Sequence, residues 1–407
     1  MSNESILKMQ NEATLRFIKE HRFDDVRELA LLHPSTPQSL PPSSVNIFWA
    51  LTQIQGRQLA EKKIPSWYRS DKIVYPPHLA VEQCSSEQTA RYKAGLLSGN
   101  TFVDLTGGFG VDFAFISVNF NESYYVEKQK ELCEIAAFNF NVLGLHPARI
   151  IHANAIEQLK NFSHIDAIYI DPGRRLSSGK KVFAIEDSEP DLLKIQDLLL
   201  EKAENVLVKL SPMLDISMAL KKLQHVAEVH VVSLENECKE LLFLLKKNCK
   251  SGPLITCVNL SKKNKQPEIS FLLSQEKVNQ IKYTSEIEQY VYEPNASLLK
   301  AGFYKGLTEL YPLRKFHPDS HLYTSAQLIP DFPGRVFRTE GYTTFNKKEL
   351  NKFLTGIDKA SITVRNFPLS VGELRKRIRI KEGGEIQLFA TTLADEKLVL
   401  IKVQHNS

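Results

Sequence analysis

The chain has 407 residues, more than one hydrophobic core ordinarily serves, so we expect two or more domains. Its composition of 43% hydrophobic and 24% charged residues is typical of globular proteins and excludes a disordered or fibrous chain. The formal net charge of +5 is small for this length and does not by itself indicate a nucleic-acid partner. The distribution of the basic residues is therefore the more informative property.

Neither membrane insertion nor export is expected. No apolar run approaches the roughly 18–20 residues that cross a bilayer, and the polar N-terminus lacks the apolar core of a signal peptide. The cysteines form no CxxC pair and no zinc-ligand spacing, so we expect reduced, packed thiols and no metal. They are Cys84, Cys133, Cys238, Cys249 and Cys257. A cytoplasmic location is the default expectation.

Residues 1–98 are predicted to form a helical domain. Apolar residues recur at helical spacing, and two Pro-rich segments, HPSTPQSLPPSS and YPPH, interrupt the pattern. The expected helices are Glu12–Glu20, Asp24–Leu32, Val45–Lys62 and Ser86–Leu97.

Residues 99–262 are predicted to form a Rossmann-like α/β domain, because short β-rich runs alternate there with helical segments. Such alternation predicts βαβ units and a mainly parallel sheet. The expected strands are 101–106, 123–127, 149–153, 166–171, 205–210 and 228–234, and the helices include 128–143 and 189–203. The stretches CKELLFLLKK and PLITCVNL should finish the sheet, with an antiparallel strand among them; residues 240–246 fit a helix or a strand.

Two small α+β units are expected after the linker SKKNKQPEIS. Residues 283–335 mix aromatic residues with Pro and Gly, and residues 336–407 alternate strand and helix. The elements expected in the second unit are 342–345, 347–355, 361–366, 370–380, 386–393 and 397–403.

The first strand of the α/β domain ends in a glycine-rich turn, VDLTGGFG (103–110), which opens a helix. Glycines there let the backbone approach a nucleotide-like ligand closely. Gly108 and Gly110 match the first two positions of the dinucleotide fingerprint G-x-G-x-x-G, but the third is Phe113. This departure disfavours NAD, and Asp104, four residues before Gly108, favours S-adenosylmethionine (SAM).

Further candidate cofactor residues lie near the same turn. Glu127 closes the second strand, where an acidic residue accepts hydrogen bonds from the ribose hydroxyls of a nucleoside. Asn154, a polar residue after the third strand, can hydrogen-bond the adenine. Thr89, on the helix before the first strand, can hold the methionine end. The alternative for the glycine segment is a tight turn without a ligand, and for Glu127 it is a surface carboxylate. The polar residues Asn154 and Thr89 could equally cap a helix. The candidates are Thr89, Asp104, Thr106, Gly108, Gly110, Glu127, Asn154 and Ala155.

The fourth strand ends in an Asp-Pro turn, where the active crevice of an open α/β sheet lies. Asp171, with Pro172 and Gly173, can present a carboxylate and carbonyls to an exocyclic N–H of a base and align it for methylation. Arg174 and Arg175 add cations suited to a phosphate or a base carbonyl. The alternative is an ordinary turn followed by two solvated arginines.

These segments resemble the bacterial class I SAM methyltransferases that carry a C-terminal THUMP-like domain. The resemblance rests on SSEQTARYKAGLL, DLTGGFGVD, YYVEKQKELCEIAAFNFNVLG, IYIDPGRR and SITVRNFPLSVGELRKRIRIKEGGEIQLFATTL, and residues 285–330 resemble a ferredoxin-like unit. It implies SAM contacts for Asp104, Gly108, Gly110 and Glu127, and a substrate-facing turn from Asp171 to Arg174. The chain is more distantly similar to RNA guanine methyltransferases acting on tRNA or rRNA. Because Gly173 stands where those relatives usually have Pro, the resemblance does not specify which atom is methylated.

Basic residues gather between positions 361 and 381, where Glu373 is the single acidic residue. Such a cluster beside a small α+β fold can follow a phosphate backbone, and a THUMP-like domain implies structured RNA. The candidate RNA contacts are Arg175, Arg365, Arg375, Lys376, Arg377 and Arg379. Three hypotheses follow: methylation of an RNA base; methylation of DNA, protein or a small molecule; and RNA binding without catalysis. A solvated basic helix that only aids solubility is the structural alternative.

Overall fold

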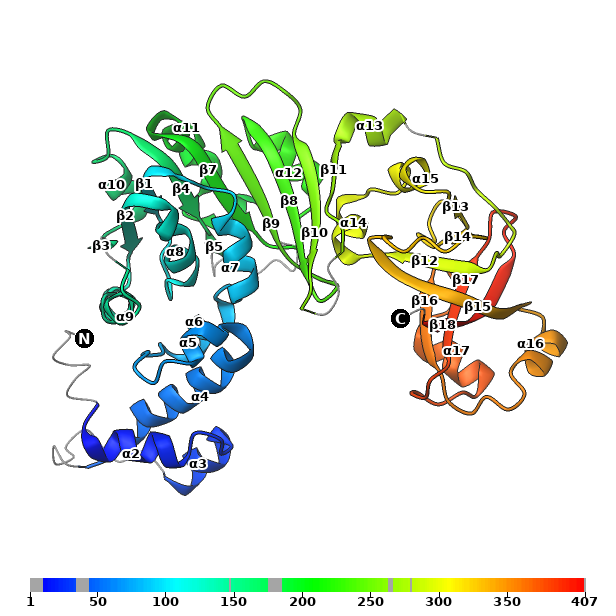
Figure 1. Cartoon of the computed structure of the whole chain (residues 1–407), viewed down its shortest axis with the longest axis horizontal. Coiled ribbons are helices and arrows are strands. Elements are labelled where there is room, and N and C mark those ends of the chain that lie inside the picture. The colour runs from blue at the N-terminus through cyan, green and yellow to red at the C-terminus, as the bar shows by residue number, and fades with distance from the viewer. Residues whose placement is uncertain are drawn as a thin grey trace. The chain divides into compact units, whose positions relative to one another are not determined.

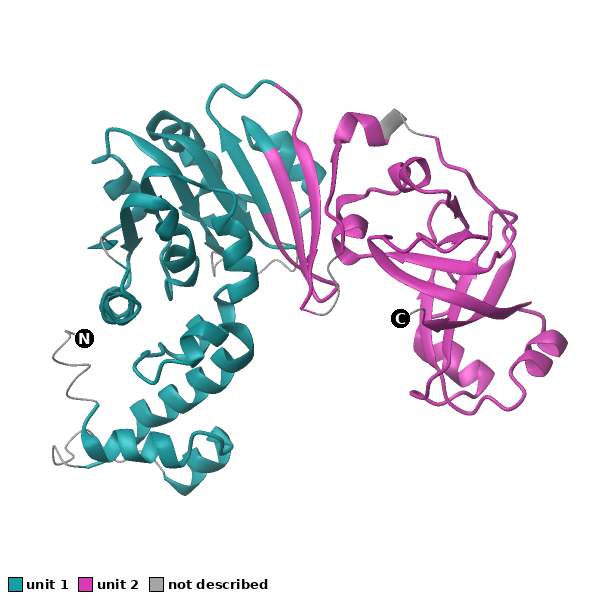
Figure 2. Cartoon of the chain, viewed as in Figure 1, with its two compact units in different colours: residues 1–227, 242–250 teal, residues 228–241, 251–407 magenta. Residues whose placement is uncertain are grey.

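The computed structural model describes residues 10–33, 44–145, 148–174, 185–262, 266–278 and 280–405. The chain divides into two compact units (Figure 2), residues 1–227 with 242–250, and residues 228–241 with 251–407. The four domain boundaries expected from the sequence stay predictions. No helix among the described residues is long and apolar enough to cross a membrane.

The N-terminal part of the first unit is helical, as expected. Asparagine and aspartate side chains cap several of its helices; Asn11, for example, accepts a hydrogen bond from the N–H of Thr14. The helices are α2 (Glu12–Glu20), α3 (Val26–Leu32), α4 (Ile47–Lys63), α5 (Pro65–Tyr68), α6 (His78–Gln83) and α7 (Glu87–Ala94). Phe17, Leu29 and Ile54 form a small core among α2, α3 and α4.

A nine-stranded sheet follows, with the strand order β11-β10-β8-β9-β7-β4-β1-β2-β3 (Figure 1). The central strands β7, β4, β1, β2 and β3 pair in parallel. Their bounds are β1 (Gly99–Asp104), β2 (Phe120–Glu127), β3 (Ala148–His152), β4 (Ile165–Ile170) and β7 (Ala203–Leu210). The helices that connect or follow them are α8 (Val111–Ile116), α9 (Lys130–Val142), α10 (Ala155–Leu159), α11 (Leu192–Lys202) and α12 (Ile216–Lys222).

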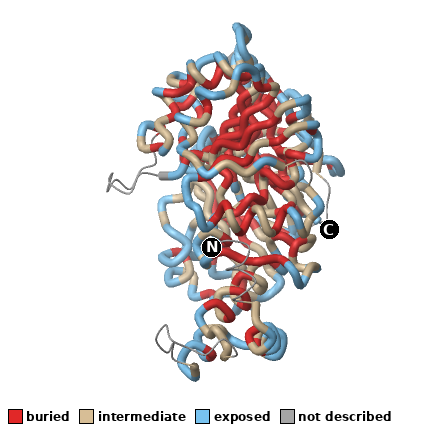
Figure 3. The backbone as a smooth tube through the Cα atoms, turned by 90° about the vertical axis from the view of Figure 1, so that its left-hand side faces the viewer, coloured by how far each residue is buried: buried red, intermediate tan, exposed pale blue. Residues whose placement is uncertain are grey.

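Most residues of the central strands β4 and β7 are buried, and buried residues gather in the interior (Figure 3). Four consecutive residues of β4, from Ala167 to Ile170, are buried, a pattern typical of strands covered on both faces. The predicted α/β class with its mainly parallel sheet is therefore confirmed.

Antiparallel pairing completes the sheet. β8 (Val226–Leu234) and β9 (Glu237–Lys246) are hydrogen-bonded neighbours joined only by Glu235 and Asn236. Both joining residues have left-handed φ angles, 48° and 64°, as in a two-residue type I′ hairpin. Residues 240–246 are therefore strand.

The edge of the sheet differs from the prediction. β10 (Leu254–Leu260) pairs in parallel with β8, and β11 (Ile269–Leu272) pairs antiparallel with β10. Ile269 and Ser270, expected in a linker, thus belong to the sheet. Phe271 of this short strand is buried, and its ring packs against Phe303 with 4.2 Å between ring centres.

The second unit contains a seven-stranded sheet with the order β13-β14-β12-β15-β18-β17-β16. Its strands are β12 (Tyr290–Pro294), β13 (Arg314–Lys315), β14 (Tyr323–Ser325), β15 (Gly334–Thr344), β16 (Ser361–Arg365), β17 (Gln387–Thr392) and β18 (Leu398–His405). β15 pairs antiparallel with β12 on one side and with β18 on the other. The segments expected as two small α+β units therefore share one sheet.

Alternate residues of β17 and β18 face opposite sides of this sheet. Leu388 and Leu400 belong to a core that includes Leu374 of α17 (Val371–Ile378) and Leu350 of α16 (Lys347–Phe353). Their neighbours in sequence, Phe389 and Ile401, belong to a separate core. The remaining helices of the unit are α13 (Leu273–Val278), α14 (Ala296–Ala301) and α15 (Gly306–Leu310).

Candidate active site

The glycine-rich segment forms a tight turn between β1 and α8. The N–H of Gly110 donates to the carbonyl of Gly107 over 2.9 Å. Gly108 and Gly110 have φ angles of 55° and 85°, which favour glycine. The sequence therefore places glycine where the backbone of the turn requires it.

Gly107 and Gly108 have different surroundings. A Cβ atom on Gly107 would lie 2.1 Å from the ring of Tyr125, which is fully buried. A Cβ atom on Gly108 would meet nothing nearer than the carbonyl oxygen of Thr106, at 3.8 Å. Packing therefore requires Gly107, whereas Gly108 borders open space in which a ligand can approach the backbone.

Glu127, the last residue of β2, holds this turn. One carboxylate oxygen accepts the N–H of Gly108 over 2.9 Å and the other accepts the N–H of Gln129 over 2.8 Å. The residue is 7% exposed. The structure thus brings the glycine turn and Glu127 together at the carboxyl ends of adjacent strands.

Asp104, the last residue of β1, is a buried carboxylate at the same edge. Its Oδ1 atom accepts the N–H of Thr106 over 2.9 Å, and no ion pair of Asp104 occurs within the described ranges. Burial raises the pKa of Asp104 well above its usual range, and the nearby charges of Asp112, Asp171 and Glu127 add to the increase. A cationic ligand group would favour the ionised form of this carboxylate. The ammonium and sulfonium groups of SAM have this charge, so the acidic residues present fit that cofactor.

Asp171 is held from two sides. Its N–H donates to the side-chain oxygen of Thr106 over 2.7 Å, which ties the turn after β4 to the glycine turn. Its carboxylate forms an ion pair with Nζ of Lys209 on β7. The Lys209 side chain is 14% exposed and that of Asp171 is 38% exposed. The lysine is thus the more buried partner, and the carboxylate keeps a face open to solvent.

The Asp-Pro turn continues into a small ribbon. Pro172 is buried, and β5 (Gly173–Arg174) pairs antiparallel with β6 (Ser188–Glu189). The helix expected from residue 189 begins instead at Leu192, because Glu189 belongs to this ribbon and a proline follows it. Arg174 lies in the ribbon, whereas the predicted RNA contact Arg175 lies outside the described residues.

Sequence reasoning missed a buried polar network beneath this edge. Asp112 of α8 accepts hydrogen bonds from Ser85 and from Tyr169 of β4, each over 2.7 Å. Nζ of Lys93 on α7, a fully buried side chain, lies 3.2 Å from the other oxygen of Asp112. Burial alone would raise the pKa of Asp112, but Lys93, Lys209 and these hydrogen bonds hold it below its usual range.

The sequence does contain a signal for Lys209. It lies within NVLVKL, and all the remaining residues after Asn205 in this segment are apolar. A charged residue inside such a strand needs a partner of opposite charge. Asp171, at the end of the neighbouring β4, is that partner.

The other predicted cofactor residues have structural roles in the described chain. Thr89 is buried in the first turn of α7, where its N–H and hydroxyl both hydrogen-bond to Ser86. Asn154 caps α10 by accepting the N–H of Ile156 over 2.9 Å, and Ala155 is the first residue of that helix. Their proposed contacts with the cofactor stay predictions.

The predicted RNA-binding cations have three kinds of environment. Arg365 pairs with the buried Glu293 at 2.7 Å, and Arg375 donates to the carbonyl of Ala360 over 3.0 Å. The guanidinium of Arg377 lies 4.7 Å from the centre of the Phe345 ring. Lys376 and Arg379 are exposed. Two of these cations are therefore engaged inside the unit, and the other three lie at its surface.

No group of three side chains that could hold a metal ion occurs in the part of the chain that the structure describes. The metal-free site expected from the sequence stays a prediction.

Comparison with known proteins defines the family. The crystal structure of an inferred methyltransferase from Porphyromonas gingivalis W83 is 34% identical, covers 100% of both chains and has a TM-score of 0.87. Residues 290–333 match a ferredoxin-like domain, and residues 334–402 match a THUMP domain-like model. The comparison with curated proteins gave no match.

Two further structures each match 39% of this chain. An rRNA methylase from Streptococcus thermophilus is 17% identical and covers 39% of this chain and 93% of its own, with a TM-score of 0.30. An inferred methyltransferase from Streptococcus mutans, in complex with SAH, is 16% identical and covers 39% and 96%, also with a TM-score of 0.30. On the full-length similarity and the two domain matches, the chain belongs to the family of bacterial class I methyltransferases with a C-terminal THUMP-like domain.

Proposed function

We propose that this chain transfers a methyl group from SAM to a base in structured RNA, such as tRNA or rRNA. The observation that carries the proposal is the meeting of Gly108, Glu127 and Asp171 at the carboxyl ends of β1, β2 and β4, beside the buried Asp104. This edge is where open α/β sheets bind ligands.

The cofactor side of the site has unused hydrogen-bonding capacity. An ionised carboxylate offers about four lone-pair positions, and Glu127 uses two for main-chain N–H groups. The other two are available to the two hydroxyls of a ribose. Gly108 leaves room for the nucleoside, and Asp104 supplies negative charge for the cationic methionine end. SAM, when bound, supplies an electrophilic methyl group.

The substrate side is built on Asp171. Its carboxylate can accept an N–H of a base and so direct the lone pair of that nitrogen toward the methyl group. Thr106 and Lys209 fix the main chain and the carboxylate, respectively. We assign Asp171 as the catalytic residue, Pro172, Gly173 and Arg174 as the turn that faces the substrate, and Lys209 as a positioning residue.

RNA is the substrate class favoured by the C-terminal unit. That unit matches a THUMP domain-like model and carries the exposed cations Lys376 and Arg379. DNA, protein and small molecules are the alternative substrates, and RNA binding without catalysis is the alternative function.

Methyl transfer from tritiated SAM tests the proposal directly. We expect label in total tRNA or rRNA, and none in DNA or protein incubated in parallel. Asp171→Asn should lower the rate by about a hundredfold, the usual size of a positioned acid–base group, while Asp197→Asn, an exposed carboxylate on α11, should not. Label confined to protein or DNA contradicts the RNA substrate. Absence of heat on calorimetric titration of intact protein with SAM contradicts the enzyme assignment.

Mass spectrometry of nucleosides from cells with and without the gene then identifies the methylated atom. A single modified nucleoside that disappears with the gene is the expected result.

A further inference from the structure

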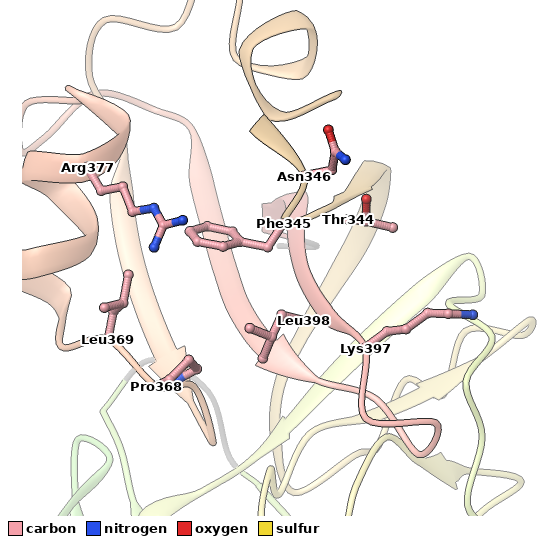
Figure 4. A pocket seen from close by; sticks show the side chains of 8 residues that line it. All are labelled: Thr344, Phe345, Asn346, Pro368, Leu369, Arg377, Lys397 and Leu398. Atoms are coloured by element: carbon pink, nitrogen blue, oxygen red, sulfur yellow. The ribbon is translucent and has the colours of Figure 1, made fainter. Parts of the chain in front are cut away.

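A pocket of about 580 Å³ opens within the THUMP-like part of the second unit (Figure 4). Three segments of the unit line it: the end of β15 with the start of α16, α17 with the loop before it, and the start of β18. The lining residues are Thr344, Phe345, Asn346, Pro368, Leu369, Arg377, Lys397 and Leu398. This volume lies in the range of sites for small organic groups.

The floor of the pocket is apolar and well fixed. The N–H of Phe345 donates to the carbonyl of Leu398 over 3.0 Å, which joins β15 to β18 at this point. The Phe345 ring packs edge-on against Phe367, with 5.0 Å between ring centres and an interplanar angle of 83°. The aromatic ring is therefore held in one orientation by its neighbours.

The rim is cationic. Arg377 lies 4.7 Å from the Phe345 ring centre and forms no ion pair within the residues described. Lys397 pairs with Asp395 at 2.7 Å but is 65% exposed. Of the acidic residues nearby, Glu373 is engaged in capping α17. Arg377 is thus the rim cation without an acidic partner among the described residues, whereas Asp395 is the counter-charge of Lys397.

We propose that this pocket receives a single unpaired nucleotide of the RNA, with its base on the surface formed by Phe345 and Leu369 and its phosphate at Arg377, which lies beside the Phe345 ring (Figure 4). Unpaired bases stack on aromatic rings and guanidinium planes, and a phosphate satisfies cations at the rim. The inference rests on the proposed function because it names which part of the RNA the C-terminal unit grips. It adds selectivity for an unpaired position, which a purely electrostatic surface lacks.

Two substitutions separate the pocket from general charge attraction. Phe345→Leu keeps an apolar side chain but removes the aromatic face, and Arg377→Gln removes the stacked cation from an exposed position. Lys376→Gln is the matched control, because it removes one charge from the same helix and the residue does not line the pocket. Melting temperatures verify that each full-length variant is folded.

The probes are a fluorescein-labelled short oligoadenylate and the same strand annealed to its complement. We expect each pocket variant to raise the Kd for the single strand by about tenfold, the effect of one lost base stack, with little change for the duplex. The control should change the two affinities equally. A decrease in single-strand affinity that is the same in the control as in the pocket variants overturns the proposal.

Crosslinking gives a second readout that does not depend on the variants. Ultraviolet irradiation of the intact protein with oligouridylate should attach RNA to peptides that contain Phe345 or Leu369. If adducts occur only on peptides without Phe345 or Leu369 while methyl transfer to RNA is observed, the pocket proposal is wrong and the proposed function still holds. If the intact protein neither binds nor methylates any RNA, both proposals are wrong.

Discussion

Substitutions of the adjacent glycines Gly107 and Gly108 in the turn after β1 should have different effects, the first on stability and the second on cofactor binding. In Gly107→Ala, the new methyl group would lie 2.1, 2.4 and 2.6 Å from three ring atoms of Tyr125, far inside the 3.5–4.0 Å of a normal carbon contact. The Tyr125 ring cannot retreat, because Phe113 and Phe140 pack against it at 5.6 and 5.5 Å between ring centres. We expect a loss of about 3 kcal/mol in the free energy of unfolding, the upper part of the range for overpacked cores.

Gly108→Arg should leave the fold intact but abolish cofactor binding. The left-handed φ of 55° costs a non-glycine residue about 1–2 kcal/mol, and the nearest atom to the new Cβ is at 3.8 Å. The arginine would occupy the space assigned to the nucleoside. Gly144→Arg is the matched control, since Gly144 has φ 69° and a Cβ atom there would meet no atom of another segment within 4 Å.

Thermal melting and calorimetric titration with SAM measure both effects. The two arginine variants should melt at similar temperatures, with SAM heat present in Gly144→Arg and absent in Gly108→Arg. Wild-type affinity for SAM in Gly108→Arg would refute the location of the cofactor site. Wild-type stability of Gly107→Ala would refute the packing argument.

Three further predictions concern the acidic residues and Lys209. Glu127→Gln leaves one acceptor oxygen for two main-chain N–H groups, so calorimetry should show SAM affinity about tenfold weaker; unchanged affinity would exclude Glu127 from the cofactor site. Lys209→Met removes the partner of the Asp171 carboxylate and should lower kcat for methyl transfer at least tenfold with the Kd for SAM unchanged, whereas an unchanged kcat would show that the ion pair is only structural. Asp104 has its pKa raised in the folded state, so the folded protein binds more protons than the unfolded chain above the ordinary pKa of Asp, and stability falls as pH rises through that window. Asp104→Asn should therefore melt at a higher temperature than wild type at neutral pH while binding SAM more weakly; a lower melting temperature at neutral pH would contradict the cost of ionising this buried carboxylate.

The sequence predicts the central sheet well because its pattern there is local. Strands such as 166–171 and helices such as 128–143 show their own period, and observed β4 and α9 differ from them only at the ends. The glycine turn and Glu127 could be found for the same reason, since fixed spacing along one βαβ unit brings them together.

The parts that sequence reasoning missed depend on contacts between distant segments. β15 begins at Gly334, although only 342–345 was expected, because the charged residues Arg335 and Arg338 hide its alternation. Pairing with β12 and β18 on both sides selects the strand there. Lys93 and Asp112 likewise give no local signal, since their partnership exists only after α7 and α8 pack together.

The basic run of the C-terminal unit shows why charge in a sequence does not specify a role. Arg375 donates a hydrogen bond to a carbonyl of the loop before β16, and Arg365 donates to the carboxylate of Glu293 on β12, so both stabilise the unit. Arg377, two residues after Arg375, instead stacks on Phe345 at the edge of a pocket. Helix geometry separates these neighbours, because residues two apart face different sides of α17. If the proposed RNA recognition depended only on total positive charge, these arginines would be equivalent. Their partners make them inequivalent, and the proposed pocket therefore assigns selectivity to Arg377, which has aromatic and apolar neighbours.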